Sequence, residues 1–257
     1  MRTIAIMSPK GGVGKTTTAD SISYIIASKY KKKVIILDGD PQGDTSRNYG
    51  VYEAEGIGMS ELLENHKMLG GLYTTNELIQ HTKYSNIDII PANGYLMKTD
   101  IKLLTDETDS QITRLREALK EIENEYDYCI CDCGRLFDMI VLNMIVAAEL
   151  VIAPVKCGGF EVEALQNLET QVNDLLDINP YLRVKGLMVM KQKNNVHRDI
   201  KEWLDMEYDM FDTAVRRSLV AEKATMEPAP VPAFSKHCTV TNDYIKIVKE
   251  LFKDLEG

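Results

Sequence analysis

A glycine-rich stretch close to the N-terminus, residues 8–18 with the sequence SPKGGVGKTTT, constrains the fold of this chain more than any other feature. The apolar run before it, residues 3–7, is typical of a buried strand, and residues 16–30 behind it carry apolar side chains at helical spacing. A strand, a glycine loop and a helix in this order form the setting in which phosphate-binding loops occur. The alternative, a glycine turn with lysines beside it by chance, does not account for the flanking strand and helix.

The three glycines explain how such a loop would hold a phosphate group. Gly11, Gly12 and Gly14 let the backbone turn so that several N–H groups point into one concavity. The helix that follows adds unpaired N–H groups and the positive end of its dipole. Lys15 is then placed to reach the β- and γ-phosphates of a nucleotide, and the Thr16 hydroxyl to ligate Mg²⁺.

The loop departs from the ordinary phosphate-loop pattern. Pro9 stands where that pattern has glycine, and a second lysine, Lys10, directly precedes the glycines. The segment PKGGVGKTTT resembles the deviant loop of the ParA/MinD family of dimerising ATPases. The resemblance implies that Lys10 reaches across a dimer interface to the partner's nucleotide and acts in catalysis together with Lys15. The nucleotide-binding residues that it implies are Lys10, Gly11, Gly12, Val13, Gly14, Lys15, Thr16, Thr17 and Arg217.

A group of acidic residues follows the apolar run at residues 34–37, which we expect to be a strand buried on both faces. Its carboxyl end delivers Asp38 and Asp40, and ligands of open α/β sheets collect at that edge. The segment DGDPQGDTS resembles an acidic box of the same family. This implies that Asp40 positions the attacking water and that Asp38 supports Mg²⁺ and the loop. Asp44 stands where the family often has asparagine, and a turn with solvated acids is the plainer alternative.

The segment YCICDC, residues 128–133, reads as another buried strand, and near its end stands Asp132. This carboxylate is the candidate Walker B group, which holds Mg²⁺ through water. After it the family usually has two prolines, whereas this chain has Gly134 and Arg135. We expect Arg135 near the γ-phosphate, where it would either stabilise the transferring charge or pair with an acid.

The cysteines of the chain have two interpretations. Cys129, Cys131 and Cys133 alternate along the strand and share one face, which favours small buried apolar residues over metal ligands. Cys157, in the segment KCGGF, superficially resembles a cluster ligand of the nitrogenase iron protein. It fits the ParA/MinD pattern better and lacks a second well-placed cysteine, and a colourless purified protein would agree with that interpretation.

The C-terminal part resembles the family only weakly. Residues 211–215 read as a strand that leads into Arg216 and Arg217, similar to the family's loop beside the adenine base, and only Arg217 matches that loop's arginine. Proline-rich residues 228–232 predict an extended connector. The last helix, residues 241–255, mixes lysines with acids on its polar face, which favours packing against the core over binding to a membrane surface.

Together these segments predict an α/β fold, a doubly wound and mainly parallel sheet with helices on both faces, as in P-loop NTPases of the SIMIBI type. We expect one ATPase domain over residues 1–257, with no separate N-terminal DNA-binding domain. The predicted strands are residues 3–7, 34–37, 87–90, 128–133, 150–155, 184–190 and 211–215. The predicted helices are residues 16–30, 59–64, 76–81, 111–124, 161–176 and 241–255.

Composition limits the classes of partner. The net charge of −9 and the pI near 5.1 argue against a dedicated, strongly basic nucleic-acid binder, but leave room for a local basic patch formed in a dimer. We expect no signal peptide, and no apolar run approaches the roughly 20 residues that a spanning helix needs. Five cysteines, an odd number, in a nucleotide-binding chain predict a reducing cytoplasm rather than a disulfide framework.

The resemblance implies a ParA-type ATPase for DNA partitioning or cargo positioning, with ATP and Mg²⁺ as cofactors. ATP would close two subunits into a homodimer, the dimer would bind DNA without sequence preference, and a ParB-like protein would stimulate slow hydrolysis. Such a protein is expected in the cytoplasm, on the nucleoid when ATP is bound, and not stably on a membrane. The candidate DNA contacts are Arg198, Lys201, Arg216 and Arg217, although a solvated surface charge explains each of them more simply.

Three other functions stay open at this point. The first is a MinD-like ATPase that positions cargo at a membrane surface, which co-sedimentation with vesicles in the presence of ATP would reveal. The second is a metallocluster carrier or reductase component of the same superfamily, which visible absorbance would reveal. The third is a nucleotide-binding protein in which Gly134 and Arg135 have abolished hydrolysis, which a turnover assay would reveal.

Overall fold

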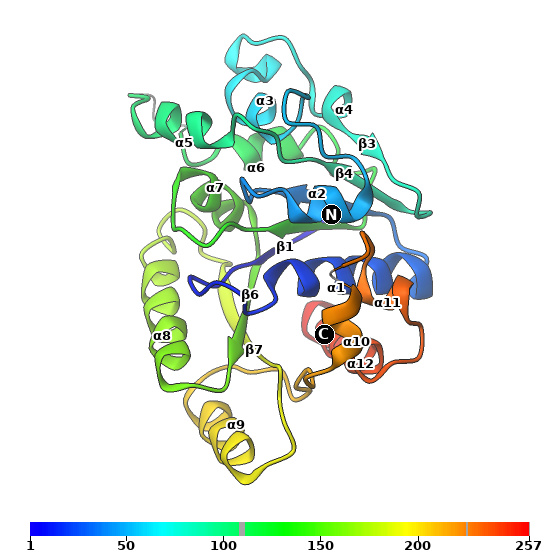
Figure 1. Ribbon diagram of the computed structural model, residues 1–257. Helices are drawn as coiled ribbons and strands as arrows, with labels where there is room; N and C mark the ends of the chain where they lie inside the picture. The colour runs from blue at the N-terminus through cyan, green and yellow to red at the C-terminus, as the bar shows by residue number, and fades with distance from the viewer. Residues whose placement is uncertain (108–110, 225, 257) are drawn as a thin grey trace.

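The computed structural model describes residues 1–107, 111–224 and 226–256. Within these residues, strands form one sheet in the order β3-β4-β2-β5-β1-β6-β7 (Figure 1). All neighbouring strands are parallel except β3 and β4, which are antiparallel. The doubly wound, mainly parallel sheet is therefore confirmed. The strands are β1 Arg2–Ile6, β2 Val34–Asp38, β3 Gln80–His81, β4 Ile87–Ile90, β5 Tyr128–Asp132, β6 Leu150–Lys156 and β7 Arg183–Val189.

The position of β1 sets the position of the site. Ile6 is in register with Asp132 of β5 on one side and with Ile152 of β6 on the other. The chain places β2 and β4 beyond β5 and places β7 beyond β6, so the winding reverses at β1. Open α/β sheets bind ligands at such a reversal, outside the carboxyl ends of the strands. The glycine loop that leaves β1 lies at this point.

Helices cover both faces of the sheet (Figure 1). Alternate residues of β1 enter two separate cores, because side chains of a strand point to opposite faces. Ile4 and Ile6 pack with apolar residues of α1 and α12, and Ala5 packs with those of α6, α7 and α8. The α-helices are α1 Lys15–Tyr30, α2 Asp44–Tyr49, α3 Met59–Glu64, α4 Thr75–Leu78, α5 Leu96–Leu104, α6 Arg114–Leu119, α7 Met139–Ala147, α8 Gly159–Asn173, α9 Asn195–Glu207, α10 Leu219–Ala224, α11 Val231–Phe234 and α12 Thr239–Glu256.

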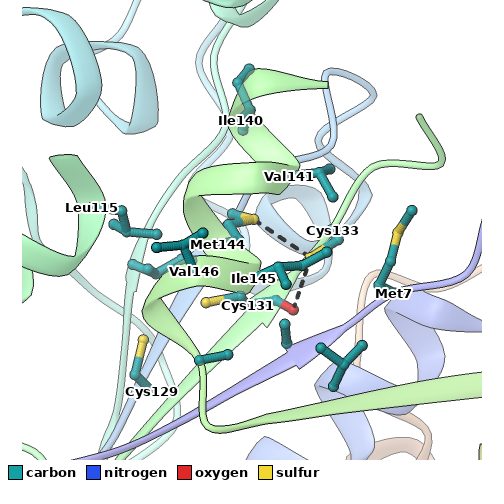
Figure 2. Packing of buried hydrophobic residues seen from close by; sticks show 14 of the residues in the cluster. Met7, Leu115, Cys129, Cys131, Cys133, Ile140, Val141, Met144, Ile145 and Val146 are labelled. Atoms are coloured by element: carbon teal, nitrogen blue, oxygen red, sulfur yellow. Dashed lines mark hydrogen bonds between the residues drawn. The ribbon is translucent and has the colours of Figure 1, made fainter. Parts of the chain in front are cut away.

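The cysteines of β5 belong to the apolar core, as the alternation in the sequence predicted. Cys129, Cys131 and Cys133 are buried together with side chains of α7 (Figure 2). Cys133 Sγ lies 3.7 Å from Met144 Sδ. Burial raises the pKa of the Cys133 thiol well above its usual range, which keeps it protonated and unreactive. These residues pack as small hydrophobic side chains.

The prediction of a strand at residues 211–215 is wrong. The segment is flanked by isolated bridges, Gly186 of β7 with Met210 and Lys191 with Arg216, and does not form a continuous ladder. The interruption is caused by a distant element, because the Thr213 N–H donates to the Glu250 carboxylate of α12 at 3.1 Å. A backbone donor that is used by a side chain cannot continue the ladder.

Two predicted helices are shorter than the sequence suggested. The helix expected at residues 76–81 is α4, which ends at Leu78, and the next residues form β3 with β4. The helix expected at residues 111–124 is regular only over α6. Proline-rich residues 228–232 are not extended throughout, because α11 begins at Val231 with proline in its first turn, where proline is tolerated.

The last helix, α12, packs in the core as predicted. Its residues Tyr244, Val248 and Leu251 are buried against the face of the sheet that α1 also covers. Thr18 Oγ1 of α1 and Tyr244 Oη share a buried hydrogen bond of 2.8 Å. Among the described residues, no helix is both long enough and apolar enough to span a bilayer.

Candidate nucleotide site

The glycine loop forms a cavity at the carboxyl edge of the sheet, as the sequence predicted. Gly12 and Gly14 have φ angles of 67° and 85°, in the left-handed region that favours glycine. Gly14 precedes α1, and its carbonyl accepts the first helical hydrogen bond from Thr18 N at 2.9 Å. The cavity has a volume of about 490 Å³. It is lined by Gly11, Gly12, Gly14, Lys15, Thr16, Thr17, Asp40, Asp44, Arg47, Asn48, Arg135, Met226 and Pro228.

The predicted metal residues Thr16 and Asp132 meet beneath this loop. Thr16 Oγ1 donates to Asp132 Oδ2 at 2.7 Å, and Thr45 Oγ1 of α2 donates to the same oxygen at 2.8 Å. The other oxygen, Asp132 Oδ1, is buried and has no hydrogen-bond partner among the described residues. The β1–β5 register explains the meeting, because Asp132 ends the strand next to the one that carries the loop.

Magnesium fits this donor set. Mg²⁺ in nucleotide sites keeps several waters and is held by one or two protein oxygens together with the phosphates. Thr16 Oγ1 is available as a ligand because it uses its proton toward Asp132. Asp132 Oδ1 is a buried acceptor that a metal-bound water would satisfy. No group of three or more His, Cys, Asp or Glu side chains in the described part of the chain has the arrangement of a metal site.

Asp38 holds the segment that follows β2. Its Oδ2 accepts from Ser46 N at 2.8 Å and from Ser46 Oγ at 2.6 Å, and its Oδ1 accepts from Asp40 N at 3.2 Å. These contacts hold the segment after β2, and the support of the glycine loop and of Mg²⁺ by Asp38 stays a prediction. Asp40 lines the cavity, and its Oδ1 accepts from Gln42 N at 2.9 Å.

A third buried carboxyl, Asp20 of α1, was missed from the sequence. Its Oδ1 accepts from Thr45 Oγ1 at 3.3 Å, and its Oδ2 accepts from Asn48 Nδ2 at 2.7 Å. The sequence did contain a signal for Asp20, because it is an acidic residue among the apolar residues of a predicted helix. Thr45 thus lies between Asp20 and Asp132, so that α2 is tied to α1 and to β5 through one hydroxyl.

Burial dominates the electrostatics of these acids. It raises the pKa of Asp38 to about 8 and of Asp132 to about 6, with bonds from Ser46 and from Thr16 opposing the rise in each case. Burial and the nearby Asp132 also raise the pKa of Asp20. Lys15 stabilises the charged form of Asp132. A cluster of buried carboxyls beside a cationic loop is a favourable place for a divalent cation.

Further cations lie around the loop. Lys10 is exposed, and Arg135 is an exposed residue that lines the cavity, while its proximity to the γ-phosphate stays a prediction. Lys156, which the sequence reading did not assign, ends β6. A Cβ atom placed on Gly12 would lie 3.8 Å from Lys156 Nζ. The glycine loop is therefore flanked by two positively charged residues, Arg135 on its β5 side and Lys156 on its β6 side.

A second, smaller cavity continues from the loop and contains the predicted base-binding arginine. Arg217 lines it together with Val13, Gly14, Thr17 and Tyr244, and its volume is about 120 Å³. The Arg217 guanidinium forms an ion pair with Glu222 at 3.3 Å. The structure therefore brings Arg217 to the end of the phosphate loop although about 200 residues separate them in sequence.

The candidate DNA-contact residues are mostly engaged within the protein. The prediction that Lys201 contacts DNA is wrong. Its side chain is only 8% exposed and pairs with Asp205, so it cannot serve as a surface contact. Arg216 binds Asp243 through Nη2 at 2.6 Å and Nε at 2.9 Å. Arg198 pairs with Asp199 at 3.1 Å and keeps 60% of its side chain exposed.

Comparison with known proteins agrees with this geometry. A family model described as an AAA domain matches residues 1–184. The chromosome partitioning protein ParA of Myxococcus xanthus is 28% identical over 259 residues, which cover 98% of this chain and 88% of that protein. The sporulation initiation inhibitor protein Soj of Bacillus subtilis is 27% identical over 255 residues, which cover 96% of this chain and 97% of Soj. The chain belongs to the ParA/MinD family of P-loop ATPases.

The fold of this ParA/MinD-family ATPase also matches solved structures. Cobyrinic acid a,c-diamide synthase from Mycobacterium smegmatis, in a structure with bound ADP and magnesium, has a TM-score of 0.83 at 21% identity. The match covers 100% of this chain and 96% of that one. The resemblance of the loop PKGGVGKTTT to the family is thereby confirmed, together with the fold that it implied.

Proposed function

We propose that this ParA/MinD-family protein is an ATP-dependent dimerising ATPase of the ParA type, which positions DNA or another cargo. The observation that carries the proposal is the Thr16–Asp132 hydrogen bond of 2.7 Å beneath the glycine loop, with Asp132 Oδ1 left for a further donor. This arrangement suits a nucleoside triphosphate with Mg²⁺. The ParA relative from Myxococcus xanthus supports a chromosome-partitioning role, because it aligns over nearly the whole chain.

Several residues in and around the cavity have a place in the proposed reaction. Lys15 and the loop N–H groups would bind the phosphates, and Thr16 and Asp132 would hold Mg²⁺, which would neutralise charge on the phosphoryl oxygens. Asp40 accepts a hydrogen bond from the attacking water and orients it. Lys10 crosses to the nucleotide of the partner subunit, and Arg135 stabilises charge on the transferring group.

Dimerisation would couple the nucleotide to the cargo. In the proposed cycle, ATP joins two subunits, and the dimer binds DNA through a basic surface that neither subunit presents alone. Arg216 and Arg217 are candidates for this surface in spite of their ion pairs, because both keep more than half of the side chain exposed. A partner protein of the ParB kind stimulates slow hydrolysis and releases the dimer from the nucleoid.

The test is the mass of the protein with ATP, with ADP and without nucleotide, measured by light scattering. We expect a dimer with ATP alone. Lys15→Ala should abolish ATP binding, Asp40→Ala should trap the ATP-bound dimer, and the exposed Lys120→Ala should behave like the wild type. If Asp40→Ala stays monomeric with ATP, the proposed switch is refuted. DNA retention should require ATP and weaken as salt rises.

A membrane-surface role is the alternative that the sequence left open. The burial of Tyr244, Val248 and Leu251 weighs against it, because the apolar face of α12 already packs on the sheet and is not available to lipid. Co-sedimentation with anionic vesicles in the presence of ATP tests this alternative directly.

A further inference from the structure

Arg47 is a cavity residue to which no sequence pattern pointed. It lies on α2 and lines the same cavity as Lys15, Thr16 and Arg135. Two of the arginines of the chain therefore face the space in front of the glycine loop, one from the segment after β2 and one from the segment after β5. The question is whether the position of Arg47 is incidental or fixed.

The guanidinium of Arg47 is held in place by an aromatic ring. Its Cζ atom lies 3.8 Å from the centre of the Tyr52 ring, which is a favourable cation–π distance. The ring in turn rests on Gly43, because a Cβ atom on that residue would lie 2.4 Å from Tyr52 Cε2. Arg47 Nε also points to the Gln42 carbonyl oxygen, at 3.4 Å. Ring and carbonyl together restrict the orientation of the side chain.

The helix that carries Arg47 is anchored to the metal site. Its neighbours on α2 each bond to a buried carboxyl: Thr45 to Asp132, Ser46 to Asp38 and Asn48 to Asp20. Of the α2 residues that line the cavity, Asp44, Arg47 and Asn48, only Arg47 carries a positive charge. Within the described residues, no carboxylate forms an ion pair with Arg47, and its Nε donates to a neutral carbonyl oxygen, so the guanidinium has no anionic partner there.

We propose that Arg47 is a phosphate-binding residue of the nucleotide site, acting on the nucleotide held by its own subunit. A guanidinium presents paired N–H groups that match two phosphoryl oxygens, and a guanidinium already oriented by Tyr52 loses little freedom on binding. The proposal rests on the proposed function, because it requires that the cavity take a nucleotide. It adds a cationic residue from outside the glycine loop to the binding site.

The test compares the affinity of Arg47 variants for ATP with Mg²⁺, measured by titration calorimetry. Arg47→Gln should weaken ATP binding about 10- to 100-fold, the range expected for a hydrogen-bonded charge pair. Arg47→Lys should recover part of the loss. The control is Lys120→Gln, which removes an exposed lysine just after α6, outside the cavity, and should bind as the wild type does. The defect of Arg47→Gln should shrink at high salt, which screens an electrostatic contact and leaves a packing defect unchanged.

A further variant separates orientation from charge. Tyr52→Leu keeps the guanidinium but removes the ring beneath it, so we expect a smaller loss, about 3- to 10-fold. It also keeps the inference testable if Arg47→Gln does not fold. Thermal unfolding without nucleotide shows whether the Arg47 variants are folded.

The outcomes distinguish a failure of the proposed function from a failure of the inference about Arg47. If neither the wild type nor Lys120→Gln binds ATP, the proposed function fails. If both bind ATP, Lys15→Ala does not, and folded Arg47→Gln binds as tightly as Lys120→Gln, the inference about Arg47 is overturned while the nucleotide site stands.

Discussion

Gly39 lies between two acids of the candidate site and has no room for a side chain. A Cβ atom on Gly39 would lie 2.3 Å from Met144 Cε and 2.5 Å from Met144 Sδ, and 3.3 Å from Ile140 Cγ2. Met144 is fully buried in the packing that Figure 2 shows, so its thioether end would have to shift within that packing to admit the Cβ atom. The φ angle of Gly39 is outside the left-handed region, so an alanine there would be limited by packing and not by backbone strain.

The cost of Gly39→Ala follows from this geometry. Overpacking of a buried site typically costs about 1–3 kcal/mol, and the loss of glycine's freedom in the unfolded chain returns about 0.4–1 kcal/mol. We expect a net loss of about 1–2 kcal/mol in the free energy of unfolding. Because Asp38 and Asp40 flank the glycine, the variant should also bind nucleotide more weakly.

A double-mutant cycle in urea tests the cause of that loss. Met144→Ala alone should cost about 2–5 kcal/mol, because it leaves a cavity. In that background Gly39→Ala should cost nothing or stabilise slightly, which gives a coupling energy of about 1–3 kcal/mol. The matched control is Gly134→Ala, whose Cβ would have its nearest neighbour at 3.7 Å, an ordinary contact, and which should leave stability unchanged or raise it by up to about 1 kcal/mol.

Two results would refute steric contact with Met144 as the cause. If Gly39→Ala unfolds at the same urea concentration as the wild type, or costs as much in the Met144→Ala background as in the wild type, then contact with the Met144 side chain is not what requires glycine. A change in the urea dependence itself would indicate an altered unfolded state instead of a packing defect.

Three other predictions concern the buried polar groups. Burial raises the pKa of Asp38 to about 8 and of Asp132 to about 6, from 3.8, so the folded protein without nucleotide holds protons that the unfolded chain loses. Its stability should therefore fall as pH rises from about 4 to 8, by up to about 1.4 kcal/mol per pH unit for each proton, and urea midpoints at pH 6 and pH 8 measure the fall. Thr18→Val should cost about 1–3 kcal/mol by leaving Tyr244 Oη unpaired, and adding Tyr244→Phe should recover part of the loss in thermal unfolding. Thr45→Val should destabilise by about 1–3 kcal/mol and weaken Mg²⁺–ATP binding in calorimetry, because it removes the hydroxyl between two buried carboxyls.

The parts of the site that are contiguous in the chain could be predicted from the sequence. The glycine loop, its strand and its helix are contiguous, so periodicity and the positions of glycine were sufficient. Asp40 and Asp132 were also found, because each stands at the end of an apolar run and parallel strands bring such ends to one edge of a sheet.

The residues that the sequence did not reveal depend on contacts between distant elements. Arg47 faces the cavity because α2 is bound to three carboxyls, and Lys156 approaches Gly12 because β6 pairs with β1. No local pattern encodes either contact. The strand expected at residues 211–215 failed for the same reason, since its apolar run is correct but Glu250 from α12 takes the backbone donor of Thr213.

The six residues of α2 are too few to form a stable helix in water, where isolated helices need about 12–15 residues. Its hydrogen bonds to Asp20, Asp38 and Asp132 therefore supply much of what keeps it folded. The backbone amide protons of α2 should then exchange with solvent at a rate that depends on the ions and phosphates near those carboxyls. In hydrogen-exchange measurements, the exchange rate of the α2 amides would therefore report whether Mg²⁺ and phosphate groups occupy the site.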